Sequence, residues 1–387
     1  MSEGLENVGL PGPREGRELI GHKEAESLLR HAFESGRMAH AWLISGPRGV
    51  GKASLAYRAT RWVLAGGGSN DAEDEGPGLF GDAIEPIPAT GEGLHLDPEH
   101  PVFRLVANGA HPDLYVLERG YDDKNKRLRR EIVVDDVRAM GHFLRRTSTA
   151  GGWRVVVIDS ADEMNRNAAN AVLKLLEEPP KRTLMLLVSH APGRLLPTIR
   201  SRCRMLRLAP LAHDGLVELL RRDDPDAPPD ELQSIAGMAE GSVGRALSIK
   251  ASDGLGHLKD ILAMIEHMPS LDTKRLYALA DTWARAPAKR KSDEEGNGAR
   301  DRSDPFAAAT EILFWWLGRA IRRTASGERE GEIVPGENKI ADRMIDRLGR
   351  DGVDRKLTDI AQRIGRGDAL NLQRKQLVID AFLELAA

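Results

Sequence analysis

Cysteine is almost absent from this chain of 387 residues, in which Cys203 stands alone. A single cysteine excludes an internal disulfide and any zinc site built from several cysteines, and it fits a reducing compartment. Aromatic residues make up only 4% of the chain, and neither sign of charge dominates, with 56 Lys and Arg against 59 Asp and Glu. The overall charge therefore points to neither nucleic acid nor a membrane surface, and any DNA contact would need a local patch.

Long hydrophobic runs are also absent. No stretch of about 18 apolar residues occurs, and the first residues contain no apolar segment of the kind a signal peptide needs. These absences predict a cytoplasmic chain with no membrane partner. The length and the 41% apolar content predict two or three globular domains.

Short apolar runs separated by helical patterns fill the first half of the chain. The runs are AWLIS (41–45), LYVL (114–117), VVVI (155–158), LMLLV (184–188) and MLRL (205–208). Runs that are apolar at consecutive positions suit a parallel sheet buried on both faces. Between them, Asp135 or Asp136 can cap one helix and Asn165 or Asn167 another. The sequence therefore predicts an α/β domain with a five-stranded parallel sheet.

The composition of the rest of the chain suggests where the domain boundaries lie. We predict a first domain over 1–209 with a flexible, Gly-, Pro- and acid-rich insertion at about 66–93. After Pro210 the strand signals end, which predicts a small helical domain over 210–268 and a larger one over 269–387. Charged, glycine-containing stretches at 289–304 and 326–338 are expected to be exposed loops.

A phosphate-binding loop is the clearest motif. GPRGVGK (46–52) matches G-x-x-x-x-G-K and lies between a predicted strand and a predicted helix. Backbone N–H groups and the helix N-terminus can surround a phosphate there, and Lys52 can reach the outer phosphates. The residues expected to contact nucleotide are Gly46, Gly49, Gly51, Lys52, Ala53 and Ser54. The loop predicts ATP as a ligand, with Mg²⁺ bound weakly or not at all because Ala53 replaces the usual hydroxyl.

The second half of such a site is expected at the end of the run VVVIDSADEMN. Asp159 fits the acid that holds the magnesium shell, but Ser160 occupies the position of the acid that activates water. A hydroxyl is a poor base at neutral pH. Together with Ala53, this predicts a chain that does not hydrolyse ATP by itself. Asp162 and Glu163 are expected to face solvent or to cap the next helix.

Several motifs of the chain resemble those of a known family. The run IDSADEMNRNAANAVLKLLEEPPKRTLMLLVS, followed by TIRSRCRMLRLAPL, resembles the AAA+ ATPases of the bacterial clamp loader, and most of all its delta-prime subunits. HAWLISGPRGVGK, HPDLY and GSVGRAL support the same resemblance, which covers residues 18 to about 250. It implies an AAA+ domain, a helical lid and a helical collar. It also implies a five-subunit loader containing tau or gamma motors and delta, which meets a sliding clamp and primed DNA.

The resemblance also implies roles for three residues. Arg202, in the Ser-Arg-Cys triplet, would be an arginine finger for a neighbouring subunit's ATP site, against the alternative of an ordinary surface cation. Ser189 matches sensor 1, or is a strand-end cap. Arg245 matches sensor 2, or is a solvated helix residue.

Two departures and two alternatives remain. Relatives with a zinc module carry a cysteine cluster before the HPD motif, whereas this chain has none there, and the scattered His95, Asp97, Glu99 and His100 do not predict zinc. The basic run 124–130 is expected to be an exposed hairpin or helix surface rather than a base-stacking site. The alternatives to a delta-prime-like subunit are an active tau or gamma motor ATPase and an AAA+ helicase loader or branch-migration motor.

Overall fold

The computed structural model describes residues 12–66, 93–122, 127–148, 152–285, 304–326, 331–369 and 372–387. Apart from their end residues, the predicted insertion at 66–93 and the predicted loop at 289–304 lie outside the described residues.

All five predicted apolar runs form strands of one parallel sheet, as predicted. Its strands are β1 (Ala41–Ser45), β2 (Leu114–Leu117), β5 (Arg154–Ile158), β6 (Thr183–Ser189) and β7 (Arg204–Arg207). The order across the sheet is β2-β5-β6-β1-β7, and every neighbouring pair is parallel. Strands β1, β5 and β6 are buried along their whole length. They carry no alternating pattern because both faces of the sheet are covered.

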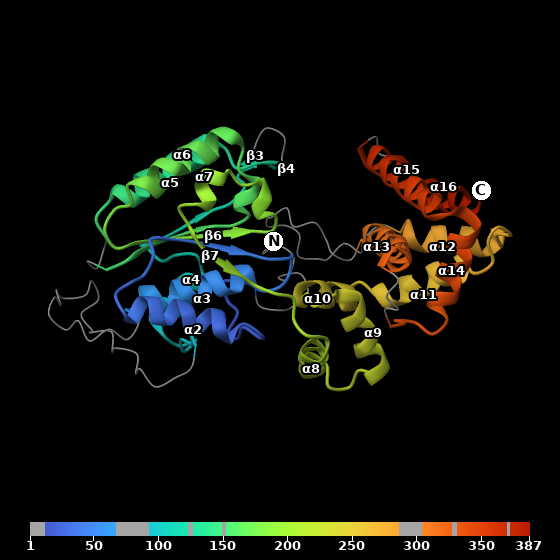
Figure 1. Cartoon of the computed structure of the whole chain (residues 1–387), viewed down its shortest axis with the longest axis horizontal. Coiled ribbons are helices and arrows are strands. Elements are labelled where there is room, and N and C mark those ends of the chain that lie inside the picture. The colour runs from blue at the N-terminus through green and yellow to red at the C-terminus, as the bar shows by residue number, and fades with distance from the viewer. Residues whose placement is uncertain are drawn as a thin grey trace.

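Helices form a layer on each face of the sheet (Figure 1). One layer holds α5 (Val134–Arg145), α6 (Arg166–Glu177) and α7 (Pro197–Arg200), and the other holds α2 (Lys23–Glu34), α3 (Lys52–Leu64) and α4 (Pro101–Ala107). Successive strand residues point to opposite layers, so Leu43 joins the core under the first layer and Ile44 the core under the second. Short 3-10 turns η1 (Ala161–Glu163) and η2 (Pro192–Arg194) follow β5 and β6.

The start of one crossover helix agrees with the sequence and the start of the other does not. Asn165 caps α6, because its side-chain oxygen accepts the Ala168 N–H at 2.9 Å. The predicted cap of α5 by Asp135 or Asp136 is wrong, since Val133 is the N-cap residue. Asp136 lies inside the first turn and its carboxylate reaches back to accept the Val133 N–H at 3.1 Å. An acid at the third helical position satisfies the same unpaired donor from within the helix.

The described part of the basic run at 124–130 begins at Arg127, and its first two residues form a strand. Strands β3 (Tyr121–Asp122) and β4 (Arg127–Leu128) pair antiparallel as a separate two-stranded sheet.

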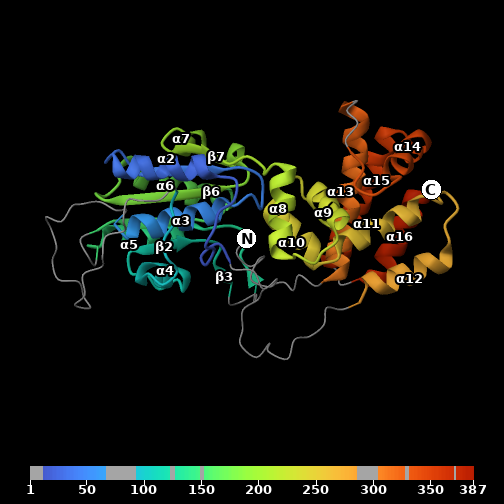
Figure 2. The ribbon, with the colours of Figure 1, turned by 90° about the horizontal axis from the view of Figure 1, so that it is seen from below.

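From residue 213 onwards, the regular elements in the described part of the chain are helices. The helices are α8 (His213–Asp223), α9 (Pro229–Ala239), α10 (Val243–Ala251), α11 (Gly254–Ile265), α12 (Thr273–Trp283), α13 (Pro305–Ser326), α14 (Glu337–Leu348), α15 (Arg350–Ala369) and α16 (Arg374–Ala386). We call residues 210–268 the lid and residues 269–387 the collar; this division of the chain remains a prediction. Helices α8 to α10 lie between the sheet and the collar (Figures 1 and 2). One hydrophobic cluster runs from Leu216 in α8 to Leu385 in α16, so lid and collar share a core.

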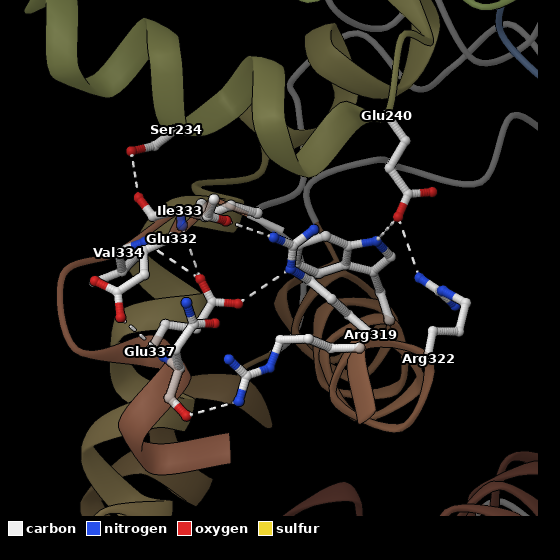
Figure 3. Close-up of polar contacts among 12 residues, drawn as sticks. Ser234, Glu240, Arg319, Arg322, Glu332, Ile333, Val334 and Glu337 are labelled. Atoms are coloured by element: carbon white, nitrogen blue, oxygen red, sulfur yellow. Dashed lines mark hydrogen bonds and ion pairs between the residues drawn. The ribbon is translucent and has the colours of Figure 1, made fainter. Parts of the chain in front are cut away.

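Part of the predicted loop at 326–338 is not exposed. Ile333 and Glu337 are buried. The Glu337 carboxylate pairs with Arg319 of α13 at 3.3 Å and accepts the Ile333 N–H at 2.9 Å (Figure 3). The prediction failed here because charge and glycine content cannot reveal that an acid is matched by a buried arginine on another helix.

Helix α13 carries two neighbouring tryptophans that pack into the shared core. Trp316 is fully buried, and Trp315 is 8% exposed where α13 meets the lid. Across the parts of the chain that the structure describes, no helix has the length and hydropathy needed to cross a bilayer.

Candidate nucleotide-binding site

The phosphate loop connects β1 to α3, as the sequence predicted. Gly46, Gly49 and Gly51 have φ values of 150°, 74° and 98°. Residues other than glycine rarely adopt backbone conformations with such positive φ values. A Cβ atom on Gly46 would lie only 2.4 Å from the Leu208 carbonyl oxygen, so the start of the loop also needs glycine for space.

Lys52 is turned into its own loop. Its side chain is 1% exposed, and its Nζ donates to the carbonyl oxygens of Gly46, at 2.8 Å, and of Pro47. Burial lowers the pKa of Lys52 from 10.5 to about 8, although Asp162 and Asp159 act in the opposite direction. To bind the Lys52 ammonium group, a phosphate would therefore have to replace the carbonyl oxygens that accept its hydrogen bonds.

The lowered pKa of Lys52 leads to a prediction about stability. The unfolded chain keeps the proton on Lys52 up to about pH 10.5, whereas the folded chain begins to release it near pH 8. The unfolding free energy therefore rises with pH across this window. Relative to Lys52→Met, the wild type should gain about 1–3 kcal/mol between pH 7.5 and pH 10.5. Urea unfolding of both proteins at each pH measures the difference, and a constant difference would contradict the lowered pKa.

Asp159 and Ser160 lie at the carboxyl end of β5, where the sequence placed them. Asp159 is 6% exposed, and its Oδ1 has no hydrogen-bond partner among the described residues. Ser160 has a left-handed backbone with φ 59°, which is unusual for a residue other than glycine. Its Oγ lies 3.4 Å from the Nε2 of His190. No carboxylate therefore occupies the Ser160 position from which water would be activated.

Residues at the end of β6 complete this side of the site. Ser189 is fully buried and is paired in register with Ser45, which directly precedes the phosphate loop. His190 follows it, and burial together with the nearby Lys52 lowers the pKa of His190 from 6.5 to about 4, so the imidazole is neutral at pH 7. The sequence analysis missed His190, and its position directly after the predicted sensor was the signal that could have found it.

The expectation that Asp162 and Glu163 face solvent or cap the next helix is wrong. The 3-10 turn η1 brings Asp162 under the end of β6, where its Oδ1 accepts the His190 N–H at 2.9 Å. Burial alone would raise the pKa of Asp162, but the hydrogen bond from the His190 backbone N–H lowers it. Glu163 pairs with Arg119 at 2.9 Å.

The residues present do not fit a complete magnesium site. Ala53 is 4% exposed and offers only a methyl group where a hydroxyl ligand would be needed, and Ser54 lies one position further along. Of the two acidic positions expected after β5, only the first carries a carboxylate, that of Asp159. Among the described residues, no group of three or more His, Cys, Asp or Glu side chains is placed to hold a metal ion.

Of the scattered residues His95, Asp97, Glu99 and His100, His100 has a structural task. The Nδ1 of His100 accepts the Val102 N–H at 3.2 Å and so caps α4. That nitrogen is already used, and the expectation that the chain holds no zinc remains a prediction.

A cavity of about 530 Å³ opens beside the phosphate loop. Its walls include Leu19 and Ile20 from the N-terminal segment, the loop with Lys52, Arg245 of the lid, and Glu311 of the collar. An apolar wall next to phosphate-binding backbone suits a nucleoside joined to phosphates. The loop glycines, Lys52 and this cavity therefore fit a nucleotide, in contrast to the metal.

The lid rests directly on the phosphate loop. The Gly244 N–H donates to the Gly49 carbonyl oxygen at 3.0 Å, and a Cβ atom on Gly49 would lie 2.2 Å from the Oγ of Ser242. The Arg245 guanidinium, for which sensor 2 and a solvated helix residue were the alternatives, pairs with Glu240 at 3.6 Å and lies 5.1 Å from the centroid of the Trp315 ring.

Arg202 lies outside the chain's own cavity. Its Nη2 pairs with Glu177 at 2.8 Å, its Nη1 donates to the Thr198 carbonyl oxygen at 3.1 Å, and its side chain is 37% exposed. The neighbouring Cys203 is buried, and burial raises the pKa of its thiol to about 12, which makes it unreactive. Of the predicted site residues, the structure gathers the loop, Asp159 and Ser189 at one sheet edge and leaves Arg202 apart.

A doubly covered parallel sheet that carries a phosphate loop at its carboxyl edge, with a helical lid over that loop, defines an AAA+ P-loop module. Residues 95–212 match the family model described as "DNA polymerase III, delta subunit". The chain is 35% identical over 252 residues to the DNA polymerase III subunit delta-prime of Pseudomonas aeruginosa, covering 64% of this chain and 67% of that protein. The Escherichia coli subunit delta-prime is 31% identical over 259 residues, covering 67% of this chain and 68% of that protein. The chain therefore belongs to the family of DNA polymerase III delta-prime subunits.

The tau subunit of DNA polymerase III matches this chain at lower identity than these two delta-prime subunits. The Escherichia coli DNA polymerase III subunit tau is 28% identical over 293 residues, covering 70% of this chain and 41% of that protein. The solved structure of a DNA polymerase III gamma subunit-related protein from Thermotoga maritima covers 95% of this chain and 100% of that chain at 16% identity. Its TM-score is 0.34, which is too low to weigh in the argument.

Proposed function

We propose that the chain acts as the delta-prime-like stator of a bacterial clamp loader, which helps to load the sliding clamp onto primed DNA. In this role it does not use its own site as a motor, and it donates Arg202 in trans to the ATP site of a motor subunit. The observation that carries the proposal is a phosphate loop whose hydroxyl position is Ala53 and whose activating-acid position is Ser160. The partly exposed Arg202, outside its own cavity, supports donation to a neighbour.

The partners follow from the family. We infer that tau or gamma motors and delta bind this chain, and that the clamp and primed DNA are met through the assembled complex in the cytoplasm. If ATP binds, the backbone of the phosphate loop and Lys52 would hold its phosphates, while Leu19 and Ile20 would face the nucleoside. Nucleotide would then serve to shape the loop and the lid rather than to drive a reaction here.

An active motor of the tau or gamma type is the alternative function. The match to tau favours it, but Ser160 provides no base for the attacking water. A planar cation from a neighbour can compensate charge on the phosphates, but it cannot replace that base.

Steady-state ATP hydrolysis tests the proposal. We expect no turnover by the purified chain alone, and strong turnover after motor and delta subunits, clamp and primed DNA are added. Lys52→Ala in this chain should leave the turnover of the assembled loader within about twofold, because its own site is not the motor. Turnover by the isolated chain that disappears in Lys52→Ala would show instead that this is a motor subunit.

A further inference from the structure

Glu240 joins the lid to the collar. It ends α9 in a left-handed conformation with φ 49°. Its Oε1 accepts the Nε1–H of Trp315 at 2.9 Å and pairs with Nη2 of Arg322 at 3.2 Å; Figure 3 shows Glu240 facing Arg322. Its Oε2 lies 3.6 Å from Nη1 of Arg245. One carboxylate therefore contacts two residues of collar helix α13 and an arginine that lines the cavity.

Arg245 is held on the collar side of the cavity by this acid and by an aromatic face. Its guanidinium lies over the Trp315 ring as well as beside Glu240. A guanidinium over an indole is attracted by the ring's negative face. Burial lowers the pKa of Arg245, and the negative charges of Glu240 and Glu311 act in the opposite direction. Its Nε is buried without a partner among the described residues, so the group keeps a donor that a phosphate could use.

The opposite end of the same segment touches the phosphate loop. The backbone N–H of Gly244 donates to Gly49, and Arg245 and Lys52 line the same cavity. The side chain of Arg245 can therefore be drawn toward either α13 or bound phosphates, while its backbone stays on the loop.

We propose that Glu240 and Trp315 are positioning residues that hold Arg245 on the collar side of the cavity, and that phosphates of a bound nucleotide compete with them for Arg245. The competition is an equilibrium between two positions of one side chain. If a ligand binds only when Arg245 is in its less populated position, the affinity is reduced in proportion to the fraction of molecules in that position.

Binding of a fluorescent ATP analogue to the full chain, without added Mg²⁺, tests this competition. Glu240→Gln keeps an acceptor for Trp315 but removes the charge that attracts Arg245, so affinity should rise about fivefold. In an Arg245→Ala background the same substitution should give no gain, because no side chain is left to release.

Two matched variants separate this effect from simpler ones. Ser234→Ala removes another lid–collar hydrogen bond, from Ser234 Oγ to the Ile333 carbonyl oxygen at 2.9 Å, without touching Arg245, and should not change affinity (Figure 3). Glu311→Gln removes a negative charge from the cavity wall, and its gain should persist in Arg245→Ala. A gain of Glu240→Gln that also persists there would reduce the proposal to a general charge effect and overturn it.

Thermal unfolding gives a readout that needs no nucleotide. The Tm losses of Glu240→Gln and Arg245→Ala should be less than additive, because each variant breaks the same contact. Additive losses would overturn the proposal, as would absence of binding by every variant. Neither result would affect the proposed stator function, which is measured by turnover of the assembled loader.

Discussion

Arg202→Ala should reduce clamp loading by the reconstituted complex about tenfold or more while leaving its assembly intact. A planar cation against the γ-phosphate accelerates phosphoryl transfer by roughly 10³ to 10⁵ at the site it serves. If Arg202 serves one ATP site of the loader, as proposed, the other sites would be unaffected, so total ATP turnover should fall less than clamp loading does. Folding should be unaffected, because the half-exposed pair of Arg202 with Glu177 contributes only about 0–1 kcal/mol.

The measurement is transfer of a labelled clamp to primed DNA by complexes that contain each variant. Arg194→Ala is the matched control, since Arg194 is an exposed arginine of the same segment. Arg202→Lys keeps the charge but loses the planar fork, and should recover only part of the activity. Full loading with Arg202→Ala would remove the arginine finger from this chain.

Arg58→Met should destabilise the chain by about 3–5 kcal/mol. Arg58 of α3 pairs with Glu26 of α2, and both side chains are 7% exposed. It also donates to the Arg17 carbonyl oxygen, which fixes the segment leading to Leu19 at the cavity wall. Removal of the guanidinium leaves the carboxylate of Glu26 buried without its counter-ion.

Urea unfolding of the single and double variants measures the loss. Glu26→Leu combined with Arg58→Met should recover most of the stability, because no buried charge is left unpaired. Arg138→Ala breaks an exposed pair with Asp135 and should change stability by less than about 0.5 kcal/mol. A loss below about 1 kcal/mol for Arg58→Met would mean that water reaches Glu26 in the folded chain.

The sheet could be predicted from the sequence because its signal is local. Runs such as the one that became β6 are short and apolar at consecutive positions, as expected for a strand covered on both faces. The phosphate loop was equally readable, since its spacing and its place between strand and helix suffice. Asn165 as a helix cap belongs to the same class of short-range signals.

The contacts that control the site could not be read from the sequence. Glu240 and Arg245 meet Trp315 through packing of lid on collar, which no local pattern encodes. Asp162 looked solvent-facing because its partner, the backbone of His190, comes from the next strand of the sheet. The side chain of Lys52 points into its own loop because it donates to the Gly46 carbonyl oxygen. The direction of that carbonyl group cannot be predicted from composition.

The hydrophobic cluster shared by lid and collar has a mechanical consequence. The described helices of the lid and collar share one core, the lid end of this unit contacts the phosphate loop, and the collar helices lie on the side away from the sheet (Figure 1). The joint of this unit is the short connection after β7, where Leu208 still bonds to the sheet and Leu211 already bonds to the lid. A rotation at that joint would move the collar further than the lid, because the displacement grows with distance from the joint.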